Sequence, residues 1–385
     1  MKNKNTFVAI LIAFTILLGG LFGSVSAAFA DETVDCNAKA ALLMDGDTGK
    51  IVFEKNPTER LQIASMVKIM TLNIIFEEIE KGNLDYDTEI VASEYATGMG
   101  GSQAFLDTNC AYKASELIKS IIVGSANDSC VAMAEHIAGS VPSFVARMND
   151  KAEKLGMNNT YFVNCTGLPA PNQYSCAEDV AAMTRELISH NGFFDFSKIW
   201  MFDFVHPSGR VTQLSNTNKL VRFYEGCDGG KTGFTSEALS CLSATAKRGD
   251  TRLLCVVIGA PDSKTRNAEV SKLFNYGFAN FETKKFVQGG EHLQERVNVS
   301  NGKQQDVGAI VGRDVVLFGK KGEYKDCVLE KEFYDCLAPL KAGDKIGELK
   351  VVRNGEVLES SDLLADGDVE KKGYMDIVND MVNKW

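Results

Sequence analysis

Residues 63–72, IASMVKIMTL, set Ser65 three positions before Lys68 inside an otherwise apolar run. Apolar residues recur at helical spacing as far as Gly82, which predicts a helix over residues 65–81. On a helix, positions i and i+3 share one face, so the hydroxyl and the amine would point the same way. The positive end of the helix dipole disfavours an ammonium there, and a neutral lysine can take the proton of a serine. The alternative is a serine that caps the helix beside a surface lysine.

The spacing alone does not identify the chemistry. Ser300 and Lys303 repeat it in SNGK, a segment that we expect to form a solvent-exposed turn. Further elements are therefore needed to separate a nucleophile with its base from ordinary helix capping.

Two such elements follow in the chain. VGSANDS places Ser125 and Asn127 in a loop just before a helical run, and GGKTGFT places Lys231, Thr232 and Gly233 on a predicted strand. Taken singly, the asparagine could cap its helix and the lysine could be an exposed strand residue. Taken in order with SMVK, the elements predict a serine nucleophile activated by a lysine.

The patterns around these elements predict a domain of the α/β (α+β) class. KAALLMDGDTGKIVFEKN predicts two strands joined by a turn, and GGKTGFTSEA, LSCLSATAKRG and TRLLCVVIGA predict three more. Strands at both ends of the segment with helices between them predict one sheet closed by distant parts of the chain. The helical patterns lie near residues 113–123, 127–138, 142–155, 178–190 and 263–281.

Beyond residue 284 the sequence changes to short strand patterns, with Asn-Gly turn signals at residues 301–302 and 354–355. This predicts a small all-β domain over residues 284–366. Residues 370–385 predict a terminal amphipathic helix, which could lie on a membrane surface or dock on its own protein.

The N-terminus and the composition indicate an exported protein. Residues 1–30 combine early lysines, an apolar core and small residues before Asp31, the pattern of a signal peptide; an uncleaved anchor is the alternative. A net charge of −10 with no long basic run argues against nucleic acid as a partner. None of the ten cysteines forms a C-x-x-C pair, so we expect most to be buried free thiols; Cys327 and Cys336 could face each other across a hairpin.

Other hydrolase templates fail. The chain has four histidines and no H-E-x-x-H, G-x-S-x-G or Walker A motif, so we expect no metal and no cofactor. The set SMVK, SAN and KTG instead resembles the serine penicillin-recognising enzymes, with S-x-x-K, S-D-N and K-T-G. Within them the chain is similar to the low-molecular-mass penicillin-binding proteins, serine-type D-alanyl-D-alanine carboxypeptidases of peptidase S11 type. MVKIMT, SANDSCVAMAEHIAGS, LGMNNTYFVNCTGLP and KTGFTSEA all carry this likeness.

The resemblance implies a fold and a reaction. It implies a transpeptidase-like domain over residues 31–283, with a helical cluster and a mainly antiparallel sheet. It implies removal of the terminal D-alanine from peptidoglycan muropeptides, β-lactams as covalent inhibitors, and a role in cell-wall biogenesis. The terminal helix of this family commonly anchors it to the membrane, so the protein would act at the extracytoplasmic face of that membrane or in the cell wall.

The resemblance also implies the roles of single residues. Ser65 would be the acylated nucleophile and Lys68 its general base, and Ser125 and Asn127 would complete the proton network. Lys231 would add positive potential. The residues expected to bind substrate are Lys231, Thr232, Gly233 and Arg266, with the backbone N–H groups of Ser65 and Phe234 as oxyanion hole.

Three alternatives stay open. A class A β-lactamase shares the acylation machinery but places a glutamate before the third motif, and TYFVNCTGLPAPNQYS contains none. A transpeptidase that uses an amine acceptor is chemically close. A non-catalytic cell-wall-binding protein would keep the fold without the chemistry.

Overall fold

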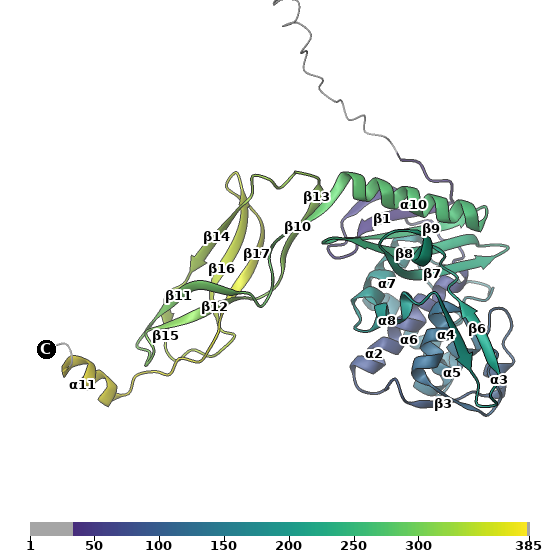
Figure 1. Cartoon of the computed structure of the whole chain (residues 1–385), viewed down its shortest axis with the longest axis horizontal. Coiled ribbons are helices and arrows are strands. Elements are labelled where there is room, and N and C mark those ends of the chain that lie inside the picture. The colour runs from purple at the N-terminus through teal and green to yellow at the C-terminus, as the bar shows by residue number, and fades with distance from the viewer. Residues whose placement is uncertain (1–33, 383–385) are drawn as a thin grey trace, which may run out of the picture. The chain divides into compact units, whose positions relative to one another are not determined.

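The computed structural model describes residues 34–382 (Figure 1). The chain divides into two units, Met1–Asp35 and Cys36–Trp385, and the description below concerns the second. The predicted signal peptide, residues 1–30, lies outside the described residues and stays a prediction.

A five-stranded sheet in the order β2-β1-β9-β8-β7 organises the N-terminal part of this unit. Every neighbouring pair is antiparallel, and β1 pairs with β9 from the far end of the domain. The predicted closure of the sheet by distant segments is therefore confirmed. Its strands are β1 (Ala40–Asp45), β2 (Ile51–Lys55), β7 (Cys227–Thr235), β8 (Leu239–Arg248) and β9 (Thr251–Ala260).

Helices cover both faces of this sheet. Helix α10 (Ser263–Asn280) packs on one face against β8 and β9, and the helical cluster lies on the other (Figure 1). All of the helical patterns read from the sequence form helices. The cluster contains α2 (Lys68–Glu80), α3 (Glu94–Thr97), α4 (Ala114–Val123), α5 (Asn127–Ala138), α6 (Val141–Lys154), α7 (Ala177–Ser189) and α8 (Phe193–Ser197).

Helix α2 runs through the middle of the cluster. Its residues Lys68–Phe76 are all buried, polar ones included, because helices and sheet surround it. Two of its buried polar side chains donate to backbone carbonyls: Thr71 Oγ1 to that of Cys165 at 2.7 Å, and Asn73 Nδ2 to that of Met183 at 2.8 Å. A lysine at the start of this helix is thus held in the interior of the domain.

Short elements that the sequence pattern does not predict complete the domain. They include the hairpin of β5 (Met201–Val205) and β6 (Val211–Ser215), the pair β3 (Glu89–Val91) and β4 (Ala111–Lys113), and α9 (Leu220–Phe223).

The C-terminal part is all-β, as the sequence predicts. A six-stranded sheet has the order β14-β16-β17-β12-β11-β15, and β10 (Phe281–Val287) pairs with β13 (Val315–Lys320). Asn354 and Gly355 both have positive φ, 53° and 83°, the type I′ geometry that joins two strands by a two-residue turn. The sheet contains β11 (His292–Ser300), β12 (Asp306–Val311), β14 (Val328–Phe333), β15 (Cys336–Leu337), β16 (Lys345–Arg353) and β17 (Glu356–Ala365).

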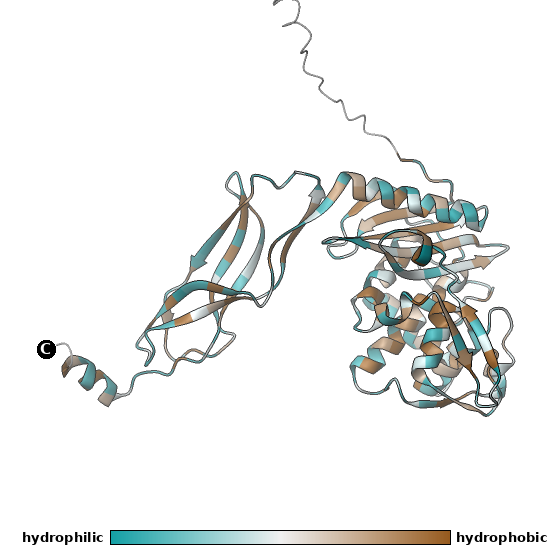
Figure 2. Ribbon diagram, viewed as in Figure 1, coloured by the Kyte–Doolittle hydropathy of each residue, from teal (hydrophilic) through white to brown (hydrophobic). Residues whose placement is uncertain are grey.

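Helix α11 (Tyr374–Val382) ends the described chain. None of its residues is buried. Figure 2 shows apolar and polar residues together on it, and its exposed apolar side chains are Tyr374, Met375, Ile377, Met381 and Val382. Among the described residues, no helix has the length and apolarity that crossing a membrane requires.

All of the cysteines except the half-exposed Cys110 and Cys327 are buried, and the nine that follow Cys36 in the chain are free thiols. The expectation of mostly buried, unpaired thiols is confirmed. Cys327 and Cys336 form no disulfide.

Candidate active site

Ser65 lies in a 3-10 turn, η1 (Ala64–Val67), that leads directly into α2. Neither element has a side-chain capping bond at its N-terminus, so the alternative of a capping serine is wrong. Ala64 has a φ of +48°, a left-handed conformation that is costly for a residue with a Cβ. The half-buried Ser65 thus follows a strained backbone position, and its hydroxyl faces Lys68 Nζ at 3.1 Å.

The amine of Lys68 is fully buried and has three oxygen neighbours. Besides Ser65 Oγ, it contacts Asn127 Oδ1 at 2.6 Å and the carbonyl oxygen of Thr166 at 2.5 Å. No carboxylate forms an ion pair with it among residues 34–382. Burial lowers the pKa of Lys68, opposed by smaller effects of Cys130, Cys165 and Asp128. A lysine in this environment can serve as a neutral base.

The SAN element brings two side chains to the same place from the start of α5. Ser125 has a φ of +61° and accepts a hydrogen bond from Lys231 Nζ at 2.9 Å. Asn127 Nδ2 donates to the carbonyl of Gly100 at 2.7 Å, which turns its Oδ1 toward Lys68.

Lys231 is a buried lysine on β7, not the exposed strand residue that its pattern alone allowed. Its pKa lies well below the ordinary lysine value, first because of burial and then because of the nearby positive charge of Lys68. Two buried lysines close together disfavour carrying two positive charges at once, and here the effect lowers the pKa of Lys231.

The rest of the KTG element fixes how β7 approaches the serine. A Cβ on Gly233 would lie 2.5 Å from the carbonyl oxygen of Ile63 and 3.2 Å from the backbone nitrogen of Ser65, so only glycine fits. Thr232 Oγ1 donates to Thr217 Oγ1 at 2.8 Å. The next residue, Phe234, has a side chain that is 68% exposed. The backbone of β7 therefore passes beside the amide of Ser65, where two N–H groups could converge on an oxyanion.

Arg266, on α10, forms no hydrogen bond with the other predicted residues, all of which lie in the described part of the chain. Its guanidinium is buried and donates to Asn267 Oδ1 at 2.9 and 3.1 Å and to the carbonyl of Cys241 at 3.5 Å. Its charge lies close enough to contribute to the lowered pKa of Lys231. It has no acidic partner within the described part of the chain.

The sequence reasoning missed three residues of this site. The carbonyl of Thr166 contacts Lys68, and the hydroxyl of Thr217 contacts the KTG threonine. Asp128 is fully buried and accepts from the backbone N–H groups of Ala104 and Leu106, so it anchors the loop between α3 and β4. Backbone acceptors and loop anchors have no sequence signature; only the position of Asp128 beside Asn127 could have drawn attention to it.

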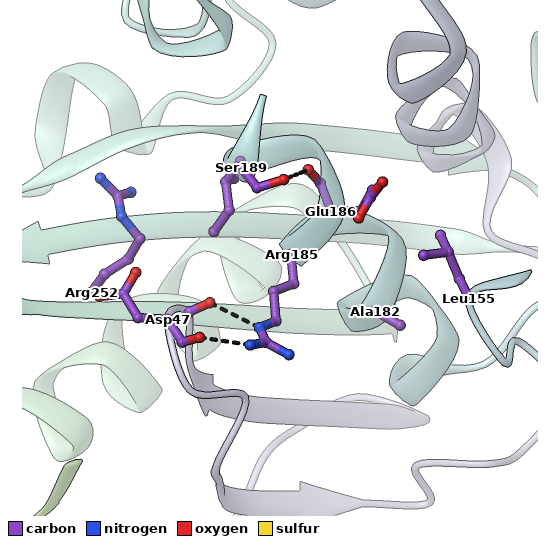
Figure 3. Close-up of a pocket in the computed structure, with 9 residues that line it drawn as sticks. Asp47, Leu155, Ala182, Arg185, Glu186, Ser189 and Arg252 are labelled. Atoms are coloured by element: carbon purple, nitrogen blue, oxygen red, sulfur yellow. Dashed lines mark hydrogen bonds between the residues drawn. The ribbon is translucent and has the colours of Figure 1, made fainter. Parts of the chain in front are cut away.

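A separate pocket of about 530 Å³ lies away from these residues, between the β1–β2 turn and α7 (Figure 3). Its Arg185 donates to the carbonyls of Gly46 and Asp47 at 3.2 and 2.6 Å. It contains none of the predicted site residues, and its second arginine, Arg252, pairs with Asp228 at 2.9 Å.

The sequence matches the peptidase S11 family, D-alanyl-D-alanine carboxypeptidase, over residues 26–262, and the C-terminal domain of penicillin-binding protein 5 over residues 281–371. The chain therefore belongs to the peptidase S11 family of D-alanyl-D-alanine carboxypeptidases, which are hydrolases.

Individual relatives agree with this assignment. The chain is 39% identical to the D-alanyl-D-alanine carboxypeptidase DacF of Bacillus subtilis, with 90% of each chain covered. It is 32% identical to DacC of Escherichia coli, covering 92% of this chain and 90% of the relative. Among solved structures, penicillin-binding protein 5 of Haemophilus influenzae superposes with a TM-score of 0.70 at 32% identity, covering 88% of this chain and 99% of the other. The predicted fold class and family are confirmed.

Proposed function

We propose that this protein removes the terminal D-alanine from peptidoglycan pentapeptide stems through an acyl-enzyme on Ser65. The observation that carries the proposal is the buried amine of Lys68, 3.1 Å from the serine hydroxyl and without a carboxylate partner among the described residues. Membership of the carboxypeptidase family supports the choice of substrate.

Acylation begins with attack of Ser65 Oγ on the carbonyl carbon of the penultimate D-alanine, while Lys68 takes the hydroxyl proton. The backbone N–H groups of Ser65 and Phe234 hold the oxyanion; one such donor contributes about 2.7–4 kcal/mol in well-studied hydrolases. Collapse of the tetrahedral intermediate breaks the peptide bond, and the proton returns to the leaving nitrogen of D-alanine by way of Lys68 or Ser125.

Substrate binding uses the positive groups of the site. The terminal carboxylate of the stem accepts hydrogen bonds from Thr232 and Lys231 and is attracted by Arg266, whose buried guanidinium carries an unmatched positive charge. Water then hydrolyses the ester on Ser65. A β-lactam acylates the same serine and leaves slowly.

The β-lactamase alternative has less support. The segment that holds the deacylating glutamate in those enzymes corresponds here to residues 160–175, and its contribution to Lys68 is the carbonyl of Thr166. A transpeptidase remains chemically close, because an amine acceptor would need no further catalytic group.

The test is D-alanine release from a muropeptide pentapeptide, measured beside labelling by a fluorescent penicillin. We expect release and stable labelling in the wild type and neither in Ser65→Ala. Fast penicillin hydrolysis without D-alanine release would favour the β-lactamase, and a folded wild type without any adduct would favour the non-catalytic alternative.

We further propose that residues 1–30 direct export, that residues 31–283 and 284–366 form the catalytic and β domains, and that residues 370–385 bind the outer surface of the membrane. The exposed apolar side chains of α11 support the last point. Co-sedimentation with lipid vesicles should be lost when residues 370–385 are deleted, with labelling by penicillin unchanged. Equal sedimentation of both forms would refute the anchor.

A further inference from the structure

A tight turn at residues 164–168 lies directly against the catalytic pair. The carboxamide of Asn164 holds it: Oδ1 accepts from the N–H groups of Thr166 and Gly167 at 3.1 and 2.7 Å and from Thr166 Oγ1 at 3.2 Å. Its Nδ2 donates to the carbonyl of Leu168 at 2.9 Å. One side chain therefore bonds four polar groups of the turn.

The turn is fitted to the segment that carries the nucleophile. Gly167 has a φ of +81°, and a Cβ there would lie 2.1 Å from the carbonyl oxygen of Ala64 and 2.9 Å from the nitrogen of Ser65. This close packing leaves the carbonyl of Thr166 pointing at Lys68 Nζ at 2.5 Å. A shift of the turn would move this acceptor relative to the base.

The acceptor matters because of the valence of a neutral amine. A neutral lysine has two N–H bonds and one lone pair, whereas the carbonyl oxygens of Thr166 and Asn127 can only accept. If both short contacts use the N–H bonds, the lone pair faces the remaining neighbour, Ser65 Oγ. The two acceptors thus aim the lone pair at the proton that it must remove.

We propose that Asn164 is a positioning residue for acylation: by holding the carbonyl of Thr166 against Lys68, it aims the base at Ser65. This inference rests on the proposed function, since it concerns the same proton transfer. Asn164 touches neither Ser65 nor Lys68 and acts through the turn alone.

The charged and titratable groups around Lys68 determine how its pKa should respond to changes in the turn. The groups that face the amine are Lys231 on β7, Asp128 and Cys130 on α5, and Cys165 in the segment before Thr166. The Thr166 carbonyl stabilises an ammonium more than an amine, because its dipole attracts the charge. Its loss should lower the pKa of Lys68, and a new negative charge in the turn should raise it.

The experiment measures the rate constant of acylation by a fluorescent penicillin from pH 5 to 10, together with thermal unfolding. Asn164→Ala should lower the plateau rate by about 10- to 100-fold, the scale expected for a misplaced catalytic group. The acidic limb of its pH–rate profile, where the acylation rate falls as Lys68 becomes protonated, should move to lower pH. Asn164→Asp keeps the acceptor oxygen and adds negative charge, so its acidic limb should move to higher pH.

Asn149 is the matched control. It braces the same chain segment two residues upstream of Asn164, accepting from the N–H of Phe162 and donating to its carbonyl, both at 2.9 Å. Asn149→Ala should lower the unfolding temperature but leave the plateau rate of acylation and the acidic limb of the pH–rate profile as in the wild type.

Each outcome decides between the alternatives. The inference would be overturned if Asn164→Ala kept the plateau rate and the acidic limb of the wild type, or if Asn149→Ala changed both as much as Asn164→Ala does. Asn164 would then have only a structural role. If Asn164→Ala does not fold, the direction of the limb in Asn164→Asp decides alone. A folded wild type that is never acylated would refute the proposed function itself, which separates the two failures.

Discussion

Two serine–lysine pairs in this chain have the same spacing and opposite surroundings. Lys68 is 0% exposed, faces the hydroxyl of Ser65, and has no acidic partner among residues 34–382. The side chain of Lys303 is 48% exposed and pairs with Glu370 at 2.6 Å, just after an exposed Ser300. Burial lowers the pKa of Lys68, whereas the hydrogen bond that Lys303 donates to Glu370 raises the pKa of Lys303.

The Ser-x-x-Lys spacing therefore places two side chains on one side of the backbone and determines nothing about their environment. What makes Lys68 a candidate base is the surrounding fold: a helix buried on all sides, a second buried lysine on β7, and two carbonyl acceptors. None of these surrounds Lys303. The following changes should separate the two lysines.

The largest difference should follow from replacing each lysine by arginine. Arg cannot be deprotonated in proteins, so at position 68 it places a permanent charge where the account has a neutral amine, and it cannot accept the serine proton. We expect Lys68→Arg to slow acylation of Ser65 by about 10²- to 10⁴-fold, the range of general base catalysis. Lys303→Arg should acylate like the wild type. Intact-mass detection of the penicilloyl adduct measures both, and equal adduct formation in the two variants would erase the distinction.

A smaller difference should appear in stability against pH. The pKa of Lys68 is lower in the folded protein than in the unfolded chain. At any pH between these two pKa values, the unfolded chain therefore binds one proton more than the folded protein. Lys68 therefore costs stability at neutral pH, and this cost shrinks as pH rises, by up to about 1.4 kcal/mol per pH unit. In chemical denaturation, the free energy of unfolding of the wild type should rise relative to that of Lys68→Met between pH 6 and pH 9.

Lys303→Met is the control for that slope. The pKa of Lys303 is raised in the folded state, so its contribution is fully present below the unfolded pKa and is lost only as pH rises through the folded one. Its stability relative to the wild type should be constant from pH 6 to 9. The account would be contradicted if the difference in unfolding free energy between Lys303→Met and the wild type changed with pH, or if that of Lys68→Met did not.

The smallest effect concerns the thiols near the two lysines. Burial raises the pKa of Cys130 to about 11 and raises that of Cys165 further, whereas Cys327, in the domain of Lys303, is half-exposed. Because only accessible thiolates react readily, a thiol reagent should label Cys327 in the native protein and spare the other two. Rapid native labelling of Cys130 would show that the interior around Lys68 is open.

Much of this site could be predicted from sequence because its side chains come in short motifs at element boundaries. Ser65, Ser125, Asn127 and Lys231 were found in this way, and the structure brings them together around Lys68. Periodicity likewise predicted the sheet and the helices around it.

The remainder depends on backbone groups and on distant packing, which leave no local pattern. The carbonyl of Thr166 lies 98 residues from Lys68 in sequence, and only the fold shows that it meets the amine. The start of the helix predicted over residues 65–81 differs for a related reason: residues 64–67, against which Gly167 and Gly233 pack, form a 3-10 turn, and the α-helix begins at Lys68. The local partners of Arg266, Asn267 and the carbonyl of Cys241, were equally invisible.

The central claim is that Lys68 is a neutral base, and the side-chain ¹⁵N resonance of this lysine tests it most directly. With lysine labelled at Nζ, a pH titration should show a resonance that titrates well below the ordinary lysine value of about 10.4 and disappears in Lys68→Arg. The resonance of Lys303 should titrate above that value in the same spectra. A Lys68 resonance that titrates at or above the ordinary value would contradict the account.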